Sequence, residues 1–237
     1  RLGTLYNNLG QVDEAKKMTT RAYELRDKVS EAERLYIEAR YFSSVVNDQQ
    51  KALDAYKVWL GTYPNDYTAL MNSALLLKQQ GDRDEAIRRL EMAVKVAPDQ
   101  PLARTNLGQI YFEAGRFDDA KRAYEEAIVL KDSTSARIGL YQIAIYLGDA
   151  ALGAEQVAAV QGRRDEVEMV GIRMLAAAYR GRMKEAAELA ADVQARALAL
   201  SRPQLAANSV AQLAINEAVV GRSEEHTSEL QSRFGIS

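Results

Sequence analysis

The stretch Leu107-Gly-Gln-Ile-Tyr-Phe-Glu-Ala-Gly-Arg-Phe-Asp-Asp-Ala-Lys-Arg-Ala-Tyr-Glu-Glu-Ala127 decides the fold. Over residues 118–130 the apolar side chains recur at i, i+3 and i+4, whereas charged side chains take the other face. That spacing predicts an amphipathic helix. Gly115 precedes it and can adopt the left-handed backbone conformation that ends a helix. The stretch therefore predicts two helices joined by a tight turn.

The same pattern returns along the chain with a period of 34 residues. Gly81-Asp-Arg-Asp-Glu-Ala86 becomes Gly115-Arg-Phe-Asp-Asp-Ala120, and a looser copy, Gly181-Arg-Met-Lys-Glu-Ala186, follows 66 residues later. In the first copy Asp82 is positioned to cap a helix and Glu85 to complete a capping box. Such a period is typical of stacked helix hairpins. Their two helices approach closely only at small residues, here predicted to be Ala74, Ala86, Gly108 and Ala120.

These positions resemble the tetratricopeptide repeat. The copy with Leu107-Gly108, Tyr111, Gly115, Ala120, Tyr124 and Ala127 matches the family pattern most fully. The resemblance implies an all-α, right-handed superhelical solenoid of antiparallel helix hairpins. We expect about six repeats over residues 1–221, truncated at both ends.

Some copies depart from the pattern. The step from the first copy to the second is three residues too long, which predicts an insertion near residues 27–30. Arg40 stands where a small residue is expected, and Asn47 stands where the turn glycine is expected. Tyr141 likewise takes the place of Gly108 at a spacing of 33. Packing must be adjusted at these sites.

Composition excludes several function classes. Lys and Arg number 31 against 33 Asp and Glu, so the basic excess expected of nucleic-acid or anionic-membrane binders is missing. The chain has no cysteine and one histidine, His226, which leaves little for metal sites or catalytic triads. We expect no enzyme activity, no cofactor and no metal. A cytoplasmic location is expected, although any targeting segment before Arg1 lies outside this sequence.

The candidate binding site is the concave groove formed by the first helices of successive repeats. Asn72 and Asn106 stand 34 apart and Gln109 and Gln142 stand 33 apart. Amide side chains can pair with both the donor and the acceptor of an extended peptide backbone. In the family this asparagine often does so, although it is also simply the commonest residue at its position. The residues expected to flank the groove are Arg34, Tyr41, Lys78 and Phe112.

Residues 21–66 carry a narrower resemblance, to the repeat regions of large bacterial signalling proteins. In that group the repeats follow a serine/threonine kinase, winged-helix or cyclase domain. The most favoured function is a protein–protein interaction scaffold that binds a partner peptide or protein segment. The alternatives are the regulatory region of a bacterial serine/threonine kinase and the sensor module of a transcription regulator.

The segment Arg222-Ser-Glu-Glu-His-Thr-Ser-Glu-Leu-Gln-Ser232 resembles the translation of a common sequencing adaptor. We therefore interpret residues 222–237 as a non-native tail that contributes nothing to the fold. The tail is rich in Ser, Glu and Thr and offers few apolar anchors, so it is expected to bury too little surface to order itself. A first helix without its partner is expected just before it, around Leu213-Ala214 and Gly221.

Overall fold

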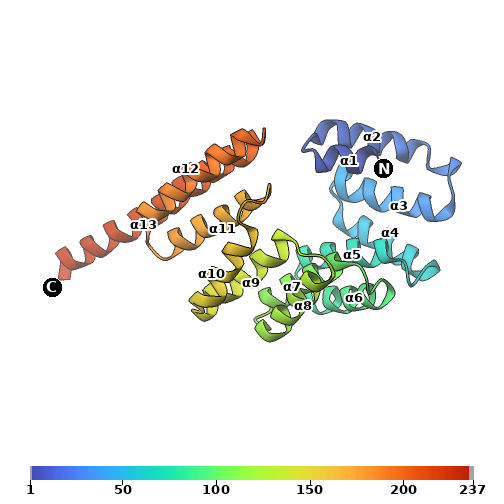
Figure 1. The fold of residues 1–237 in the computed structure, drawn as a ribbon. Helices are drawn as coiled ribbons and strands as arrows, with labels where there is room; N and C mark the ends of the chain where they lie inside the picture. Colours follow the sequence, from blue (N-terminus) through green and yellow to red (C-terminus); the bar gives the residue numbers. More distant parts are fainter. Residues whose placement is uncertain (1, 235–237) are drawn as a thin grey trace. The chain divides into compact units, whose positions relative to one another are not determined.

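The computed structural model describes residues 2–234, and within them every regular element is a helix (Figure 1). Twelve of these α-helices form six consecutive hairpins, and a further helix follows. The helices are α1 Leu2–Asn8, α2 Val12–Glu24, α3 Glu31–Tyr41, α4 Gln49–Thr62, α5 Tyr67–Gln80, α6 Arg83–Val96, α7 Pro101–Glu113, α8 Phe117–Leu130, α9 Thr134–Leu147, α10 Ala150–Val160, α11 Glu166–Tyr179, α12 Met183–Ala199 and α13 Pro203–Phe234.

The chain divides into two compact units, Arg1–Lys131 and Asp132–Ser237. The first contains the hairpins α1–α2, α3–α4, α5–α6 and α7–α8. The second contains α9–α10, α11–α12 and α13. Inside each unit the two helices of a hairpin pack along each other, so the predicted architecture of antiparallel pairs is present throughout.

The turns form as the sequence predicts. Gly81 and Gly115 have φ values of 88° and 74°, in the left-handed region that a side chain would strain. Asn47 has φ 58° and supplies the same conformation where the turn glycine is missing. Asp82 accepts a hydrogen bond from the Glu85 backbone N–H.

One expected feature of this cap is absent. The Glu85 carboxylate pairs with Arg88 at 2.7 Å and Arg89 at 3.1 Å. The predicted capping box is therefore half formed, because the side chain that should return to the Asp82 N–H is drawn along its own helix by two guanidinium groups. A complete capping box occurs instead at Ser30 and Glu33, at the start of α3.

The predicted insertion is a short 3-10 helix, Arg26–Lys28, between α2 and α3. The chain beyond Arg40 is adjusted as well, because α3 passes directly into a π-helical turn, Phe42–Val46. Such wide turns accommodate extra residues within a helix. The two departures from the 34-residue pattern therefore lie on either side of α3.

Small residues hold the hairpins together. Ala74, Ala86 and Ala120 are fully buried, and Gly108 lies against the ring of Tyr124. A Cβ atom on Gly108 would lie 2.9 Å from two carbons of that ring, closer than packed carbons approach. The 34-residue spacing of small side chains therefore reflects close packing and not helix propensity alone.

The last helix is longer than expected. Its backbone continues as helix from Pro203 to Phe234, beyond Gly221 where the repeat pattern stops. Extending an existing helix needs no new nucleation, so a weak sequence can follow a formed one. The side chains of residues 220–237, His226 among them, lie outside the described residues. The adaptor origin of this segment stays a prediction.

Candidate functional site

The two predicted asparagines occupy equivalent places on neighbouring first helices. Asn72 lies on α5 and Asn106 on α7, and both side chains are half-buried. The Asn106 side chain forms no hydrogen bond with any described residue, which leaves its amide available to a partner. Asn72 is less free, because its amide hydrogen-bonds the Tyr56 phenol of α4.

The buried Tyr56 restricts the orientation of the Asn72 side chain. Burial raises the pKa of the Tyr56 phenol to about 12, and the Asn72 hydrogen bond acts in the opposite direction. The phenol is therefore neutral over the physiological range and holds the Asn72 amide toward α4. Asn72 therefore takes part in the packing of α5 on α4, in addition to the partner binding predicted for it.

Polar side chains tie α5 to α7 beside the asparagines. Lys78 Nζ forms an ion pair with Glu113 Oε1 at 2.7 Å, and Gln109 Nε2 donates to the same carboxylate oxygen at 3.3 Å. The Lys78 charge is thus neutralised inside the fold, so it is not available as a clamp for an anionic group. Gln109, with an exposed side chain, is also engaged.

The remaining predicted residues do not gather at one place. Phe112 packs edge-on against Phe117, with 5.6 Å between ring centroids. On α3, Arg34 pairs with Glu38 at 3.0 Å, and Tyr41 stacks on Tyr23 at 3.9 Å. Arg34 and Tyr41 therefore contact residues of α3 and of its neighbour α2. Among the predicted residues, only side chains of α5 and α7 form a connected cluster.

Gln142 lies on α9, in the second unit, so the structure does not place it with the other residues. Its side chain is half-buried and makes no hydrogen bond within the described part of the chain. That Gln109 and Gln142 line the same groove stays a prediction.

Sequence reasoning missed a basic pocket in the second unit. Its walls come from α9 to α12, and it contains Tyr141, Arg173, Arg180 and Arg182. The available signals were the bulky Tyr141 in a small-residue position and two arginines seven residues apart. Neither signal could show that α11 makes little contact with α10, which is what leaves the space open.

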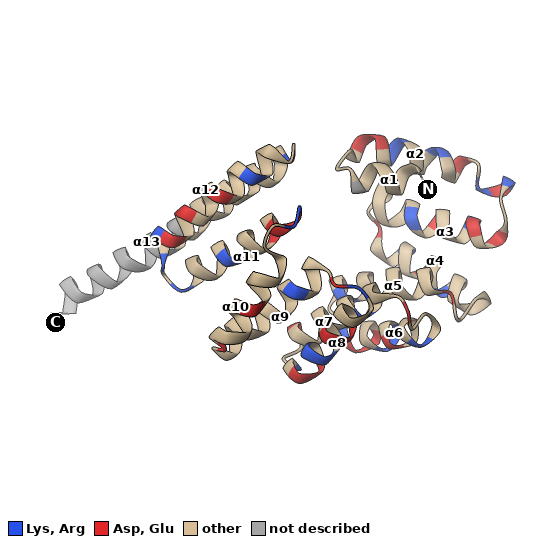
Figure 2. Cartoon of the chain, viewed as in Figure 1, with Lys and Arg blue, Asp and Glu red and all other residues tan. Residues whose placement is uncertain are grey.

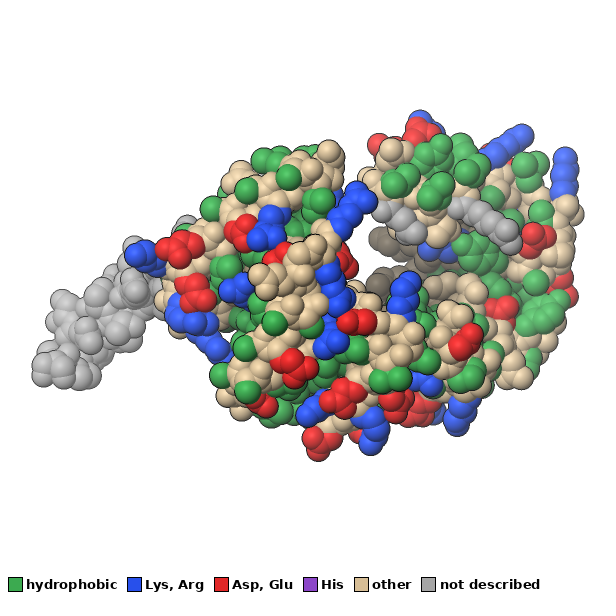
Figure 3. Space-filling view, viewed as in Figure 1, with side chains coloured by type: hydrophobic (Ala, Val, Ile, Leu, Met, Phe, Trp, Pro, Cys, Tyr) green, Lys and Arg blue, Asp and Glu red, His purple; other side chains and the backbone are tan. Residues whose placement is uncertain are grey.

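Basic and acidic residues are mixed along the described helices and loops (Figure 2). The face in Figure 3 likewise mixes acidic, basic and apolar groups. No described helix combines the length and apolarity needed to cross a lipid bilayer. On the face that Figure 3 shows, the described residues form no broad basic surface, which agrees with the near balance of charges in the sequence.

Two family models for the tetratricopeptide repeat match the chain, at residues 71–136 and 1–28. A tetratricopeptide repeat protein from Parabacteroides merdae superposes with a TM-score of 0.62, covering 93% of both chains at 15% identity. The chain contains tetratricopeptide repeats. A thermophilic member from Thermus thermophilus gives a TM-score of 0.61 at 23% identity, covering 75% of this chain and 94% of that one. The predicted solenoid of hairpins is confirmed.

Two curated relatives match this chain over part of its length. The small glutamine-rich tetratricopeptide repeat-containing protein 2 of Mycosarcoma maydis is 29% identical over 107 residues, 45% of this chain and 30% of that one. The human protein O-mannosyl-transferase TMTC1 is 32% identical over 126 residues, 52% of this chain and 14% of that protein. The chain thus spans less than a third of either relative. What they support is a repeat module of the kind that serves in general as a protein-binding scaffold.

Proposed function

We propose that this protein is an interaction scaffold whose first helices α5 and α7 bind a partner peptide in an extended conformation. Asn72 and Asn106 would pair with its backbone, since an amide offers both a donor and an acceptor to each peptide unit. The observation that carries the proposal is the half-buried Asn106 amide, which has no hydrogen-bond partner in the described structure although its equivalent on α5 has one.

The surroundings favour backbone recognition over charge recognition. Lys78, the cation nearest in sequence to Asn72 on α5, is already paired with Glu113. A partner held here would be selected for an accessible extended backbone and for side chains that fit around the Lys78–Glu113 bridge. The bridge also links the two helices, α5 and α7, that carry the asparagines.

The test is selection of peptides from a phage-displayed random library on the immobilised full chain, followed by affinity measurement for the best peptide. Replacing Asn106 by Ala should weaken binding by about 0.5–1.5 kcal/mol, the net value of one hydrogen bond. The Asn72→Ala/Asn106→Ala double variant should lose more. The melting temperature of Asn106→Ala should stay near that of the parent, whereas Asn72→Ala should show a small loss because it also releases Tyr56.

A matched control uses Gln80→Ala/Gln100→Ala, which removes two exposed amides at the ends of α5 and α7. Unchanged affinity in the asparagine variants, or an equal loss in the glutamine control, would move the site away from α5 and α7.

The parent protein is a second question. We infer from the resemblance of residues 21–66 that the module works in the cytoplasm beside an effector domain, a bacterial serine/threonine kinase or a winged-helix regulator. The genomic sequence before Arg1 tests this directly. An upstream reading frame with neither kinase motifs nor a winged helix would contradict it.

A further inference from the structure

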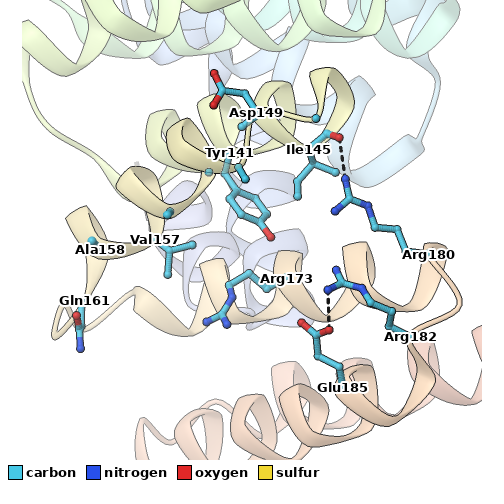
Figure 4. Close-up of a pocket in the computed structure, with 15 residues that line it drawn as sticks. Tyr141, Ile145, Asp149, Val157, Ala158, Gln161, Arg173, Arg180, Arg182 and Glu185 are labelled. Carbon is cyan, nitrogen blue, oxygen red and sulfur yellow. Dashed lines mark hydrogen bonds and ion pairs between the residues drawn. The ribbon is translucent and has the colours of Figure 1, made fainter.

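The second unit contains a pocket of about 510 Å³ between the hairpins α9–α10 and α11–α12 (Figure 4). One wall is the face of α10, which presents small side chains at Gly153, Ala154 and Ala158. Because α11 makes little contact with α10, Ala154 and Ala158 stay exposed, whereas Gly153 is buried against Tyr141 of α9. The space is large enough for several side chains of a bound segment.

Tyr141 forms the inner part of this pocket. Its side chain extends from α9 toward α11, and only 9% of the residue is exposed. Its hydroxyl makes no hydrogen bond with any residue that the structure describes. The hydroxyl is not a fully buried atom, so it faces the open space of the pocket, where a ligand group can reach it and form a hydrogen bond.

Three arginines surround the phenol, and two of them lack a carboxylate. Arg182 pairs with Glu185 at 2.8 Å. Arg180 Nη2 donates to the Ile145 carbonyl at 2.9 Å, which holds its side chain over the pocket without neutralising its charge. Arg173 is half-buried and has neither an ion pair nor a hydrogen bond within the described residues.

The acidic groups of the pocket do not balance this charge. Asp149 lies at its edge, where its Oδ1 accepts from the Leu152 backbone N–H at 2.9 Å and caps α10. Glu185 is already paired. Two cations, Arg173 and Arg180, therefore face the space uncompensated.

We propose that this pocket binds an acidic segment of a partner protein, with its carboxylates on Arg173 and Arg180 and an adjacent apolar side chain against α10. Guanidinium groups bind carboxylates through paired, charge-assisted hydrogen bonds. The Tyr141 hydroxyl can donate to the same carboxylate. Ile145, Val157 and the alanines of α10 supply the apolar wall.

The electrostatics at Tyr141 agree with this assignment. Burial raises the pKa of its phenol, while the charges of Arg173, Arg180 and Arg182 act to lower it. The arginines therefore create a positive potential at the hydroxyl, where a ligand carboxylate would sit. This site is independent of the α5–α7 proposal, because it shares no residue with it and belongs to the other unit.

The experiment measures fluorescence anisotropy of a labelled, end-capped peptide that contains Glu-Leu-Asp-Phe-Glu between Gly-Ser flanks, titrated with the full chain. Saturable binding is expected, and it should weaken as sodium chloride rises because surface charges are screened. The isosteric peptide Gln-Leu-Asn-Phe-Gln should bind at least about tenfold more weakly, since each charge-assisted bond is worth that much or more. Inorganic phosphate serves as a competitor that shows whether a bare anion suffices.

Three variants locate the peptide. Arg173→Gln should lower the affinity about tenfold, and Tyr141→Phe should lower it by a smaller factor without loss of the buried ring. Arg164→Gln is the matched control, because Arg164 is an exposed arginine of the same unit that lies outside the pocket. Its affinity should stay within about twofold of the parent, as expected for a surface charge.

Absence of saturable binding, or equal binding of the acidic and amide peptides by the unaltered chain, would overturn the proposal without requiring any variant to fold. Equal losses in Arg173→Gln and Arg164→Gln would overturn it too, because net charge alone would then account for the binding. Full displacement by phosphate at equimolar concentration with the peptide would show a bare-anion site and not a peptide site.

Discussion

The hairpins α7–α8 and α9–α10 each pack a tyrosine ring against a glycine, but the ring comes from a different helix in each hairpin. In α7–α8 the first helix supplies Gly108, and the ring of Tyr124 from the second helix lies against it. In α9–α10 the first helix supplies the ring of Tyr141, and Gly153 of the second helix lies beside it, with its ideal Cβ position 3.8 Å from the ring. The tyrosine ring thus lies on the second helix of α7–α8 and on the first helix of α9–α10.

The difference has a consequence for function. Gly153 is buried against the Tyr141 ring, and the exposed side chains next to it on α10 include the small Ala154 and Ala158, whereas α8 carries charged residues over much of its exposed surface. The pocket of the second unit opens on this small-residue face. A packing adjustment inside one hairpin thus makes room for a ligand beside it.

The largest expected effect is at the centre of α7–α8. Leu107 is 7% exposed, so Leu107→Ala should lower the free energy of unfolding by about 2–5 kcal/mol. Leu102→Ala is the control, because Leu102 lies on the same helix and is 56% exposed. Urea denaturation followed by circular dichroism measures both. A loss at Leu107 no greater than at Leu102 would remove Leu107 from the core.

Gly108→Ala should cause the next largest loss in the free energy of unfolding. The added Cβ would meet the Tyr124 ring at 2.9 Å, and that ring is 3% exposed with little room to move. Overpacking of this kind costs about 1–3 kcal/mol. Gly61→Ala provides the comparison, since nothing lies within 4 Å of its Cβ position on α4. If Gly108→Ala is neutral in urea denaturation, α7 and α8 are not in close contact there.

The repeat pattern predicted the helices, the turns and the small residues of α7–α8, because each of these depends on neighbours a fixed distance away in sequence. The same pattern marked Tyr141 as out of place but could not name Gly153 as its complement, since the sequence does not show which side chains meet across two helices. The predicted groove was harder still. Glu113 forms an ion pair with Lys78 and accepts a hydrogen bond from Gln109. Nothing in the sequence distinguishes it from the many other acidic residues.

An alkaline titration of the parent chain and of Tyr111→Phe probes α7. Burial, together with a hydrogen bond to Glu91 at 2.8 Å, raises the pKa of Tyr111 on α7 to about 12. Between pH 10 and 12 the unfolded phenol ionises while the folded one stays neutral, so stability should fall as the pH rises. Tyr111→Phe should cost about 0.5–1.5 kcal/mol at neutral pH and flatten this decline. An unchanged slope would exclude Tyr111 as its source.

An acid titration probes the second unit. Hydrogen bonds from Arg137 and Arg163 lower the pKa of Asp132, just before α9, from 3.8 to about 2. The stabilisation is complete above pH 3.8 and is lost as the pH falls toward 2. Because these side chains are partly exposed, Asp132→Asn should cost only about 0.2–1 kcal/mol at pH 7. A variant with the parent's stability at pH 7 and the parent's acid transition would contradict this.

The change in unfolding free energy caused by Gly153→Ala tests the packing of α9–α10 most directly, because its sign should be opposite to that of Gly108→Ala. At Gly153 an added Cβ would lie 3.7 Å from the Ala144 Cβ and 3.8 Å from the Tyr141 ring, which is ordinary contact. Gly153→Ala should therefore raise the free energy of unfolding by about 0.4–1 kcal/mol, through reduced entropy of the unfolded chain and better helix propensity. Urea denaturation beside Gly108→Ala should show opposite signs for the two substitutions. A loss at Gly153 as large as that at Gly108 would mean that both hairpins keep their small residue under a closely packed ring, and the account of the pocket's origin would be wrong.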